Sequence, residues 1–338
     1  MTIHENYSLR PHNTFDIEAR CSRYVEYESE HDARQLATEL RHTGRPYLII
    51  GRGSNLLLTR DYEGTVVRSA MTGIAVGERT DAYMLLVCKS GEEWEHVVDY
   101  TVGMGLYALA NLSLIPGDVG ASAVQNIGAY GVEVARFIHE VRAVDVQTSK
   151  LVTIPGSDCR YGYRQSRFKG EWKGRYLITE VVYQLPVADE PCMDYGHLRH
   201  ELEQRGIQRP TPEQLRQVVI DVRRSKLPDP SVLGNAGSFF VNPVITRREY
   251  DNLLVRFSDM PHYDVDEQHV KVPAAWLIEH CGWKGRSVGR AAVHHRQPLV
   301  LVNLGGATGS EILEVCQMVR HDVERMFGIN LKPEVNIV

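Results

Sequence analysis

The sequence predicts an α+β protein with more than one domain. A small β-α-β unit leads into a larger strand-rich unit, and from about Gly206 the pattern changes to helices. The chain has 338 residues, and at roughly 150 residues per domain this length corresponds to two or three domains. The sequence contains no internal repeat and no low-complexity segment.

Before Gly206, amphipathic helices alternate with short buried strands. We expect a helix over residues 30–42, because its alanines and leucines recur at helical spacing and Gly44 follows as a C-cap. A second helix is expected over residues 92–102, with Trp94 and Val98 on its buried face. Apolar or alternating runs predict strands at residues 47–50, 61–67, 83–87, 137–146, 151–154 and 176–185.

Three capping boxes mark helix starts in the last third of the chain. In each box a threonine is followed three residues later by Gln or Glu, namely Thr211 and Gln214, Thr246 and Glu249, and Thr308 and Glu311. The last box makes Gly305–Gly309 a helix entry, which we prefer to a phosphate-binding loop. Residues 298–303 are expected to form a strand.

The composition is that of a globular protein without a basic face. The chain is 43% hydrophobic and 24% charged, and its net charge of -5 argues against nucleic acid or an anionic membrane as a main partner. The six cysteines are scattered without a C-x-x-C pair, so we expect free thiols rather than disulfides. We find no signal peptide and no apolar run of membrane-spanning length, so the expected location is the cytoplasm.

The most unusual stretch runs from Ile115 to Gly131 and consists largely of small residues. It contains four glycines, one proline and one carboxylate, Asp118, but no lysine or arginine. Because these glycines and the proline disfavour a helix, we expect a loop whose backbone N–H and C=O groups line a flat polar ligand. A tightly packed structural loop is the alternative, and this stretch alone does not decide between the two.

A second glycine loop, G-R-G-S-N at Gly51–Asn55, follows the expected strand at residues 47–50. A loop of this kind can form a nest of N–H groups for a diphosphate. It is not a dinucleotide-binding fingerprint, because Leu56 replaces the third glycine, and it is not a P-loop, because it lacks G-K-[ST]. A plain turn is the alternative.

Arg164 and Ser238 stand in motifs that permit chemistry without requiring it. Arg164 follows Tyr161-Gly-Tyr163, and its planar fork suits a carboxylate, although a basic strand edge is the alternative. Ser238 lacks the G-x-S-x-G context of an acylated nucleophile, so it would donate a proton or hydrogen bond, or serve as a buried structural serine. The adjacent His294 and His295 form no metal-binding motif, and no metal site is expected.

Taken together, these motifs occur in the order found in one enzyme family. They are N-T-F at Asn13–Phe15, the two glycine loops, Y-G-Y-R at Tyr161–Arg164, K-L-P-D-P at Lys226–Pro230, G-N-A-G-S-F-F at Gly234–Phe240, A-A-V-H at Ala291–His294 and P-E-V at Pro333–Val335. This ordered set closely resembles the UDP-N-acetylenolpyruvoylglucosamine reductase family of bacterial peptidoglycan enzymes over nearly the whole chain. The chain departs from the usual family pattern at Ala121, Ala123 and Asn336.

The resemblance implies an FAD-binding fold of the vanillyl-alcohol-oxidase (PCMH) type with a C-terminal α+β substrate-binding domain. It implies two FAD-binding subdomains at 1–70 and 71–206, a substrate-binding domain at 207–328, and a segment at 329–338 that returns to the active site. The FAD would be bound non-covalently. The residues implied to hold it are Gly51, Gly53, Ser54, Asn55, Leu56, Ile115, Pro116, Gly117, Gly120, Ser122, Asn126, Gly128, Ala129, Tyr130 and Arg223.

Motif matching implies catalytic roles for Arg164, Ser238 and Glu334. Contacts to the UDP-sugar are implied for Tyr163, Tyr195, Lys226, Asn242 and Gln297. In the implied ping-pong reaction, NADPH and the enolpyruvyl ether of UDP-N-acetylglucosamine use one pocket in turn, and hydride reaches C3 from the flavin while C2 is protonated. The product is UDP-N-acetylmuramate, and a monomer is expected. Another FAD oxidoreductase of the same fold, or a UDP-sugar- or flavin-binding protein without catalysis, are the alternatives.

Overall fold

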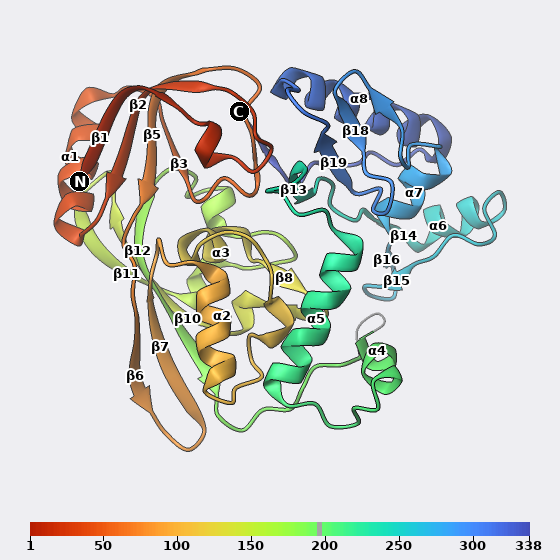
Figure 1. The fold of residues 1–338 in the computed structure, drawn as a ribbon, viewed down its shortest axis with the longest axis horizontal. Helices are drawn as coiled ribbons and strands as arrows, with labels where there is room; N and C mark the ends of the chain where they lie inside the picture. The colour runs from red at the N-terminus through yellow and green to blue at the C-terminus, as the bar shows by residue number, and fades with distance from the viewer. Residues whose placement is uncertain (195–197) are drawn as a thin grey trace. The chain divides into compact units, whose positions relative to one another are not determined.

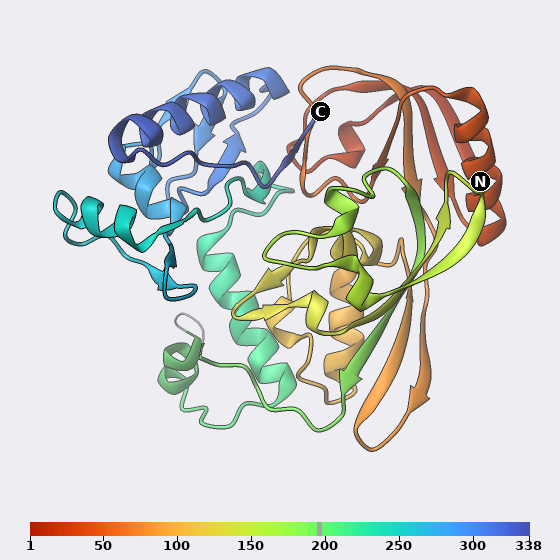
Figure 2. The same cartoon turned by 180° about the vertical axis from the view of Figure 1, so that it is seen from behind.

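The computed structural model describes residues 1–194 and 198–338. These residues form two compact units, each assembled from separate segments of the sequence. The first unit comprises Met1–Tyr7, Cys21–Arg52 and Tyr62–Ser225, and the second comprises Ser8–Arg20, Gly53–Asp61 and Lys226–Val338. Figures 1 and 2 show the elements of both units from opposite sides. This division does not test the predicted three-domain boundaries, which stay a prediction.

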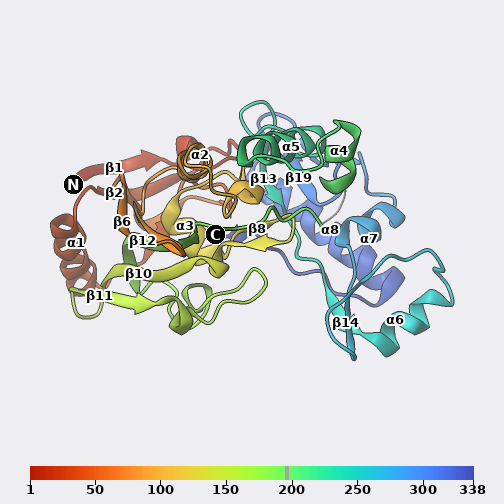
Figure 3. The ribbon, with the colours of Figure 1, turned by 90° about the horizontal axis from the view of Figure 1, so that it is seen from below.

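The first sheet of the first unit has the strand order β1-β2-β5-β3. Its strands are β1 (Thr2–Ser8), β2 (Arg20–Tyr27), β5 (Tyr62–Ser69) and β3 (Tyr47–Ile50). Both β2 and β3 run parallel to β5, and the helix α1 (Glu30–Thr43) connects β2 to β3. The apolar face of α1 is buried in a cluster shared by this sheet and a second one. Figure 3 shows α1 beside strands of both sheets.

The second sheet of the first unit is antiparallel, with the order β11-β10-β12-β7-β6. Its strands are β11 (Lys150–Pro155), β10 (Ile138–Asp145), β12 (Tyr176–Pro186), β7 (Tyr83–Lys89) and β6 (Ile74–Arg79). Glu180 on β12 accepts hydrogen bonds from Lys89 on β7 and Arg142 on β10. A row of charges therefore crosses the centre of the sheet.

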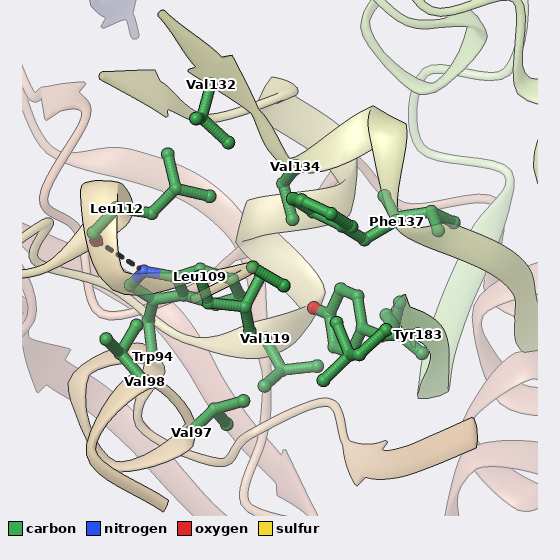
Figure 4. Packing of buried hydrophobic residues seen from close by; sticks show 14 of the residues in the cluster. Trp94, Val97, Val98, Leu109, Leu112, Val119, Val132, Val134, Phe137 and Tyr183 are labelled. Atoms are coloured by element: carbon green, nitrogen blue, oxygen red, sulfur yellow. Dashed lines mark hydrogen bonds between the residues drawn. The ribbon is translucent and has the colours of Figure 1, made fainter. Parts of the chain in front are cut away.

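Four helices complete the first unit, and all four contribute to its largest core. They are α2 (Trp94–Gly103), α3 (Val119–Gln125), α4 (Leu198–Gln204) and α5 (Pro212–Lys226). Figure 4 shows the packing at α2, where Trp94 Nε1 donates a hydrogen bond of 2.9 Å to the Leu112 carbonyl. Trp94 also meets Tyr183 of β12 edge to face, with ring centroids 5.9 Å apart. The small hairpin β8 (Gly128–Ala129) and β9 (Val132–Glu133) follows α3.

The second unit is built on an antiparallel sheet of order β13-β19-β18-β17. The strands are β13 (Gly234–Ser238), β19 (Val300–Asn303), β18 (Ala291–Val293) and β17 (Ser287–Val288), and α7 (Ala274–His280) and α8 (Gly309–Phe327) share their core. A smaller sheet contains β14 (Val244–Thr246), β16 (His269–Lys271) and β15 (Tyr263–Asp264), with α6 (Arg247–Leu254) following β14. The distant strands β4 (Leu56–Leu57) and β20 (Asn336–Ile337) pair in parallel.

Most of the predicted elements are confirmed, and one prediction is wrong. All three capping boxes form as expected, and Gly44 caps α1 in the left-handed region. However, residues 119–125, expected to be loop, form the helix α3. Only Gly120 of the four glycines lies inside this helix, Asp118 caps its start, and alanines occupy two of its positions, so the local cost of glycine is small.

Candidate functional site

The glycine loop at Gly51–Asn55 joins β3 to β4 and crosses from the first unit to the second after Arg52. Gly53 has a positive φ of 73°, and a Cβ atom there would lie 1.9 Å from the His12 carbonyl oxygen. Only glycine fits this position, because both the backbone conformation and the space exclude a side chain. No helix follows the loop, as the sequence analysis expected.

The second glycine stretch combines α3 with strained backbone on both sides. Leu114, Asn126 and Tyr130 all have positive φ angles of 46–59°, although none is glycine. Such conformations cost of order 1–3 kcal/mol each and cluster at ligand sites. The Ser122 hydroxyl is already engaged inside the protein, because it donates to the Val119 carbonyl at 2.7 Å and lies 2.9 Å from the Tyr183 hydroxyl. A ligand would therefore meet mainly the backbone of this stretch.

Arg164 is held at the end of this stretch. Its Nη2 donates a 2.6 Å hydrogen bond to the Gly128 carbonyl, and its guanidinium lies 5.4 Å from the centre of the Tyr163 ring. Asn126 stabilises the same region, because its Nδ2 donates hydrogen bonds of 2.8 Å to the Gly162 carbonyl and to the Glu133 carboxylate. The structure thus brings Arg164, Tyr163 and residues 126–128 together, as their shared assignment to a site requires.

Arg223, on α5, provides a direct test of whether the first unit fits a flavin. Its buried Nε has no hydrogen-bond partner among the described residues. Burial and the nearby charge of Arg164 lower its pKa, against the opposing influence of Tyr130 and Glu95. A buried cation with an unused donor is unfavourable unless a ligand supplies an acceptor. A group rich in carbonyl oxygens, such as a flavin ring, fits this arrangement.

In the second unit, Ser238 and Glu334 lie on neighbouring segments. Ser238 ends β13 opposite Val300, and the Glu334 N–H donates 2.8 Å to the carbonyl of Phe239, the residue after Ser238. The Glu334 carbonyl accepts from Asn55 Nδ2 at 3.3 Å. Phe239 and Phe240 are fully buried beside them. Two of the proposed catalytic residues and one proposed flavin contact therefore share one part of this unit.

The remaining substrate residues are less tightly grouped. Asn242 accepts a 2.9 Å hydrogen bond from Ala274 N at the start of α7, which leaves its amide N–H groups for a ligand. Gln297 lies in the turn between β18 and β19 and accepts from Leu299 N at 3.4 Å. Lys226 is exposed at the end of α5. Tyr195 lies outside the described residues.

The sequence analysis did not assign a role to Asp118, although it singled out this residue as the one carboxylate of its stretch. Asp118 is 4% exposed, and its Oδ1 accepts a 3.0 Å hydrogen bond from Ala121 N. Burial raises the pKa of this carboxyl to about 6. Its burial was not visible in the sequence, because it depends on the contact between two distant loops.

Neither a metal cluster nor a membrane-spanning helix is found in residues 1–194 and 198–338. No three or more His, Cys, Asp or Glu side chains of this part gather as metal ligands would. All of its helices are too short or too polar to cross a bilayer. The six cysteines are free thiols in the structure, as expected.

Comparisons with known proteins agree with the fold. A model of an FAD-binding domain matches residues 21–154, and a model of the C-terminal domain of UDP-N-acetylenolpyruvoylglucosamine reductase matches residues 229–338. The chain is 44% identical over 337 residues to this reductase from Bacteroides fragilis (strain YCH46), covering 99% of this chain and 100% of the relative. It is 43% identical over 331 residues to that of Burkholderia mallei (strain NCTC 10229), covering 97% and 95%.

A solved structure supports the same fold. The crystal structure of UDP-N-acetylenolpyruvylglucosamine reductase (MurB) from Thermus caldophilus matches 99% of both chains with a TM-score of 0.67 at 20% identity. The FAD-binding segment and the full-length relatives define the class of protein, an FAD-dependent oxidoreductase, and its fold is of the α+β type that the sequence predicted. Its identity to full-length relatives then fixes the family: the chain belongs to the UDP-N-acetylenolpyruvoylglucosamine reductase (MurB) family.

Proposed function

We propose that this protein reduces the enolpyruvyl ether of UDP-N-acetylglucosamine to UDP-N-acetylmuramate, with NADPH as reductant, in peptidoglycan precursor synthesis. The identity of 44% to the Bacteroides fragilis reductase over its whole length supports this substrate. When bound, FAD would supply the hydride chemistry, with NADPH as the source of the hydride and C3 of the enol ether as its acceptor. NADPH and the enol ether take turns in one pocket, and the protein acts as a monomer in the cytoplasm.

The observation that carries the proposal is the pair of arginines near the second glycine stretch. Arg164 is bound to the Gly128 carbonyl, and its charge acts on the buried guanidinium of Arg223. Hydride addition at C3 builds negative charge at C2 and on the adjoining carboxylate. A fixed cation aimed at developing charge is usually the largest single contribution to catalysis. We assign this role to Arg164, and we assign the flavin contact to Arg223.

Glu334 and Ser238 complete the proposed chemistry. Glu334 in its protonated form donates a hydrogen bond to the developing enolate, as a carboxylic acid kept neutral by its surroundings does. Ser238 donates the proton that C2 receives. Ser238 itself is half-buried at the end of β13. Tyr163, Tyr195, Lys226, Asn242 and Gln297 bind the UDP-sugar, and backbone groups of the two glycine loops hold FAD.

The test separates the two half-reactions in Ser238→Ala. Reduction by NADPH creates no carbanion, so stopped-flow absorbance should show flavin bleaching at close to the wild-type rate. Reoxidation by the enol ether should slow by about 10²–10⁴, the usual contribution of a positioned acid. Ser238→Cys should recover part of the loss, and Ser231→Ala, which changes an exposed serine of the same segment, should behave as wild type.

Three results would contradict this assignment. Equal slowing of both half-reactions would make Ser238 a positioning residue for the ring or the nicotinamide. Steady NADPH consumption with peroxide release in the absence of the enol ether would favour an oxidase of the same fold. Tight UDP-sugar binding without anaerobic hydride transfer would favour a binding protein.

A further inference from the structure

Asp118 of the second glycine stretch lies against Gly51, where the first glycine loop begins. Its Oδ1 accepts the N–H of Ala121 at 3.0 Å and so caps α3 inside the second loop. Its backbone forms an antiparallel bridge with Glu93, at the start of α2. The carboxyl group is 4% exposed. The side chain is therefore a fixed part of the loop and not a mobile surface acid.

The same carboxyl group lies against the first glycine loop. A Cβ atom on Gly51 would be 2.9 Å from Oδ1 and 3.0 Å from Oδ2 of Asp118, closer than real Cβ contacts. The backbone and the charge of Arg52, the next residue of this loop, both act to lower the pKa of the Asp118 carboxyl. Position 51 must therefore be glycine for the Asp118 carboxylate to keep its place, because any larger residue at 51 would push the carboxylate away.

The charges around Asp118 come from several elements. Burial raises its pKa to about 6, whereas the cations of Arg68 on β5 and Arg52 lower it. Burial raises the pKa of the Tyr27 phenol on β2 and of the Tyr183 phenol on β12, and the negative charge of Asp118 acts in the same direction. Glu93 lies 3.4 Å from Arg52 and partly neutralises that cation. The balance leaves an acid whose charge is sensitive to any further anion brought close to it.

We propose that Asp118 is a positioning residue for FAD: it ties the two glycine loops together, and it takes up a proton when the flavin diphosphate binds to the N–H groups of the Gly51–Asn55 loop. The inference rests on the assignment of these loops to FAD. The diphosphate brings negative charge to a loop whose Gly51 lies directly against this carboxyl. A protonated Asp118 keeps its contacts with both loops and no longer repels the negatively charged diphosphate.

The wild-type protein provides the first measurement. Flavin-free protein is titrated with FAD between pH 5.5 and 8.5, and binding is followed by flavin fluorescence. We expect the Kd to rise by up to about 10-fold per pH unit above the pKa of Asp118 in the flavin-free protein. At pH 7 in weak buffer, FAD binding should consume protons. A Kd that does not change with pH, without proton uptake, would overturn the proposal.

Two substitutions at Asp118 separate its two roles. Asp118→Asn keeps an oxygen for the Ala121 N–H but cannot ionise, so its Kd for FAD should be flat with pH and at least about 10-fold lower than that of wild type at pH 8. Asp118→Ala removes the tie and should weaken FAD binding at every pH. As a control, Glu203→Gln removes an exposed carboxylate of α4 that is not among the groups acting on Asp118. Its pH dependence should match wild type.

The outcomes also distinguish this proposal from the proposed function. If Asp118→Asn binds FAD as weakly as Asp118→Ala, the carboxylate itself is needed and the proton-uptake step is wrong, whatever the holoenzyme catalyses. If the pH dependence appears as expected but the loaded protein does not reduce the enol ether, the role of Asp118 stands and the proposed substrate fails. If Asp118→Ala does not fold, the proton uptake of the wild type and the Asn variant still decide.

Discussion

At the residue scale, the first unit maintains groups that are unfavourable for the protein on its own. Arg223 buries a nitrogen without a described partner, and its pKa is lowered by burial. Leu114 and Tyr130 hold left-handed backbone conformations without being glycine. Unfavourable features of this kind persist where a ligand relieves them. A substitution that removes such a group should therefore raise the free energy of unfolding of the flavin-free protein and, at the same time, weaken cofactor binding.

Arg223→Met tests this opposition. Replacing a buried, unsatisfied charge by an apolar side chain of similar length should stabilise the flavin-free protein by about 1–3 kcal/mol. The same change should weaken FAD binding, because the ring loses its cationic donor. Denaturant unfolding of the flavin-free protein and FAD titration measure the two effects. Arg224→Met, at the exposed next position of α5, should change neither; a loss of stability in Arg223→Met would refute the interpretation.

At the element scale, the strand β12 depends on one buried carboxylate. Glu180 has a side chain that is 8% exposed, between Lys89 and Arg142 on the flanking strands. Burial alone would raise its pKa, but the hydrogen bonds from these two cations outweigh burial and leave the pKa lowered. A carboxyl with a lowered folded-state pKa stabilises the protein at neutral pH, and this stabilisation is lost as the pH falls through that pKa.

Glu180→Gln should destabilise the protein by about 1–3 kcal/mol at pH 7. This figure lies below the usual cost of breaking a buried pair because both cations are about one-third exposed and partly screened. The difference from wild type should begin to shrink below about pH 4.5, where the unfolded carboxyl takes up a proton, and should disappear as the pH falls through the lower pKa of the folded carboxyl. Denaturant unfolding at pH 7 and pH 4 measures it. Glu171→Gln, which breaks an exposed pair with Arg167, should leave the free energy of unfolding almost unchanged, because exposed ion pairs are screened by solvent.

Short-range sequence patterns were sufficient to predict most helices and strands. They were insufficient for features that depend on contacts between residues far apart in the chain. The capping boxes at Thr246 and Thr308 predicted helix starts, because a cap depends only on neighbours three residues apart. The helix α3 was not predicted, because the glycines and the proline of this stretch favoured a loop, and the N-cap at Asp118 was not recognised in the sequence. The motifs pointed to Arg164, Ser238 and Glu334, whereas the buried state of Arg223 and Asp118 emerged only from packing between segments far apart in the chain.

At the scale of the whole molecule, the FAD-binding segment at 21–154 spans most of the first unit. A ligand that binds only the folded state stabilises it in proportion to its affinity. Neither glycine loop contains a His or Cys that could bond the ring covalently. Binding should therefore be reversible, and it should be visible in the melting temperature.

Acid precipitation should release all of the yellow colour into the supernatant, because FAD is held without a covalent bond. FAD at 100 times its Kd should add about 2.7 kcal/mol to the free energy of unfolding and raise the Tm of the flavin-free protein accordingly. Differential scanning fluorimetry at several FAD concentrations checks the second expectation. Colour that stays in the pellet would show a covalent link and contradict the prediction.

The pairing of β4 with β20 has a consequence for biosynthesis. Thr59 donates two hydrogen bonds to the carbonyl of Val338, 279 positions further along the chain. A ribosome must therefore translate almost 280 more codons before β4 meets its partner. Throughout that time the short strand after the first glycine loop exposes unpaired backbone groups, a condition that favours misfolding and chaperone capture. The nascent chain can assemble much of its first unit early, but it cannot close the second unit until residues 336–338 have left the exit tunnel.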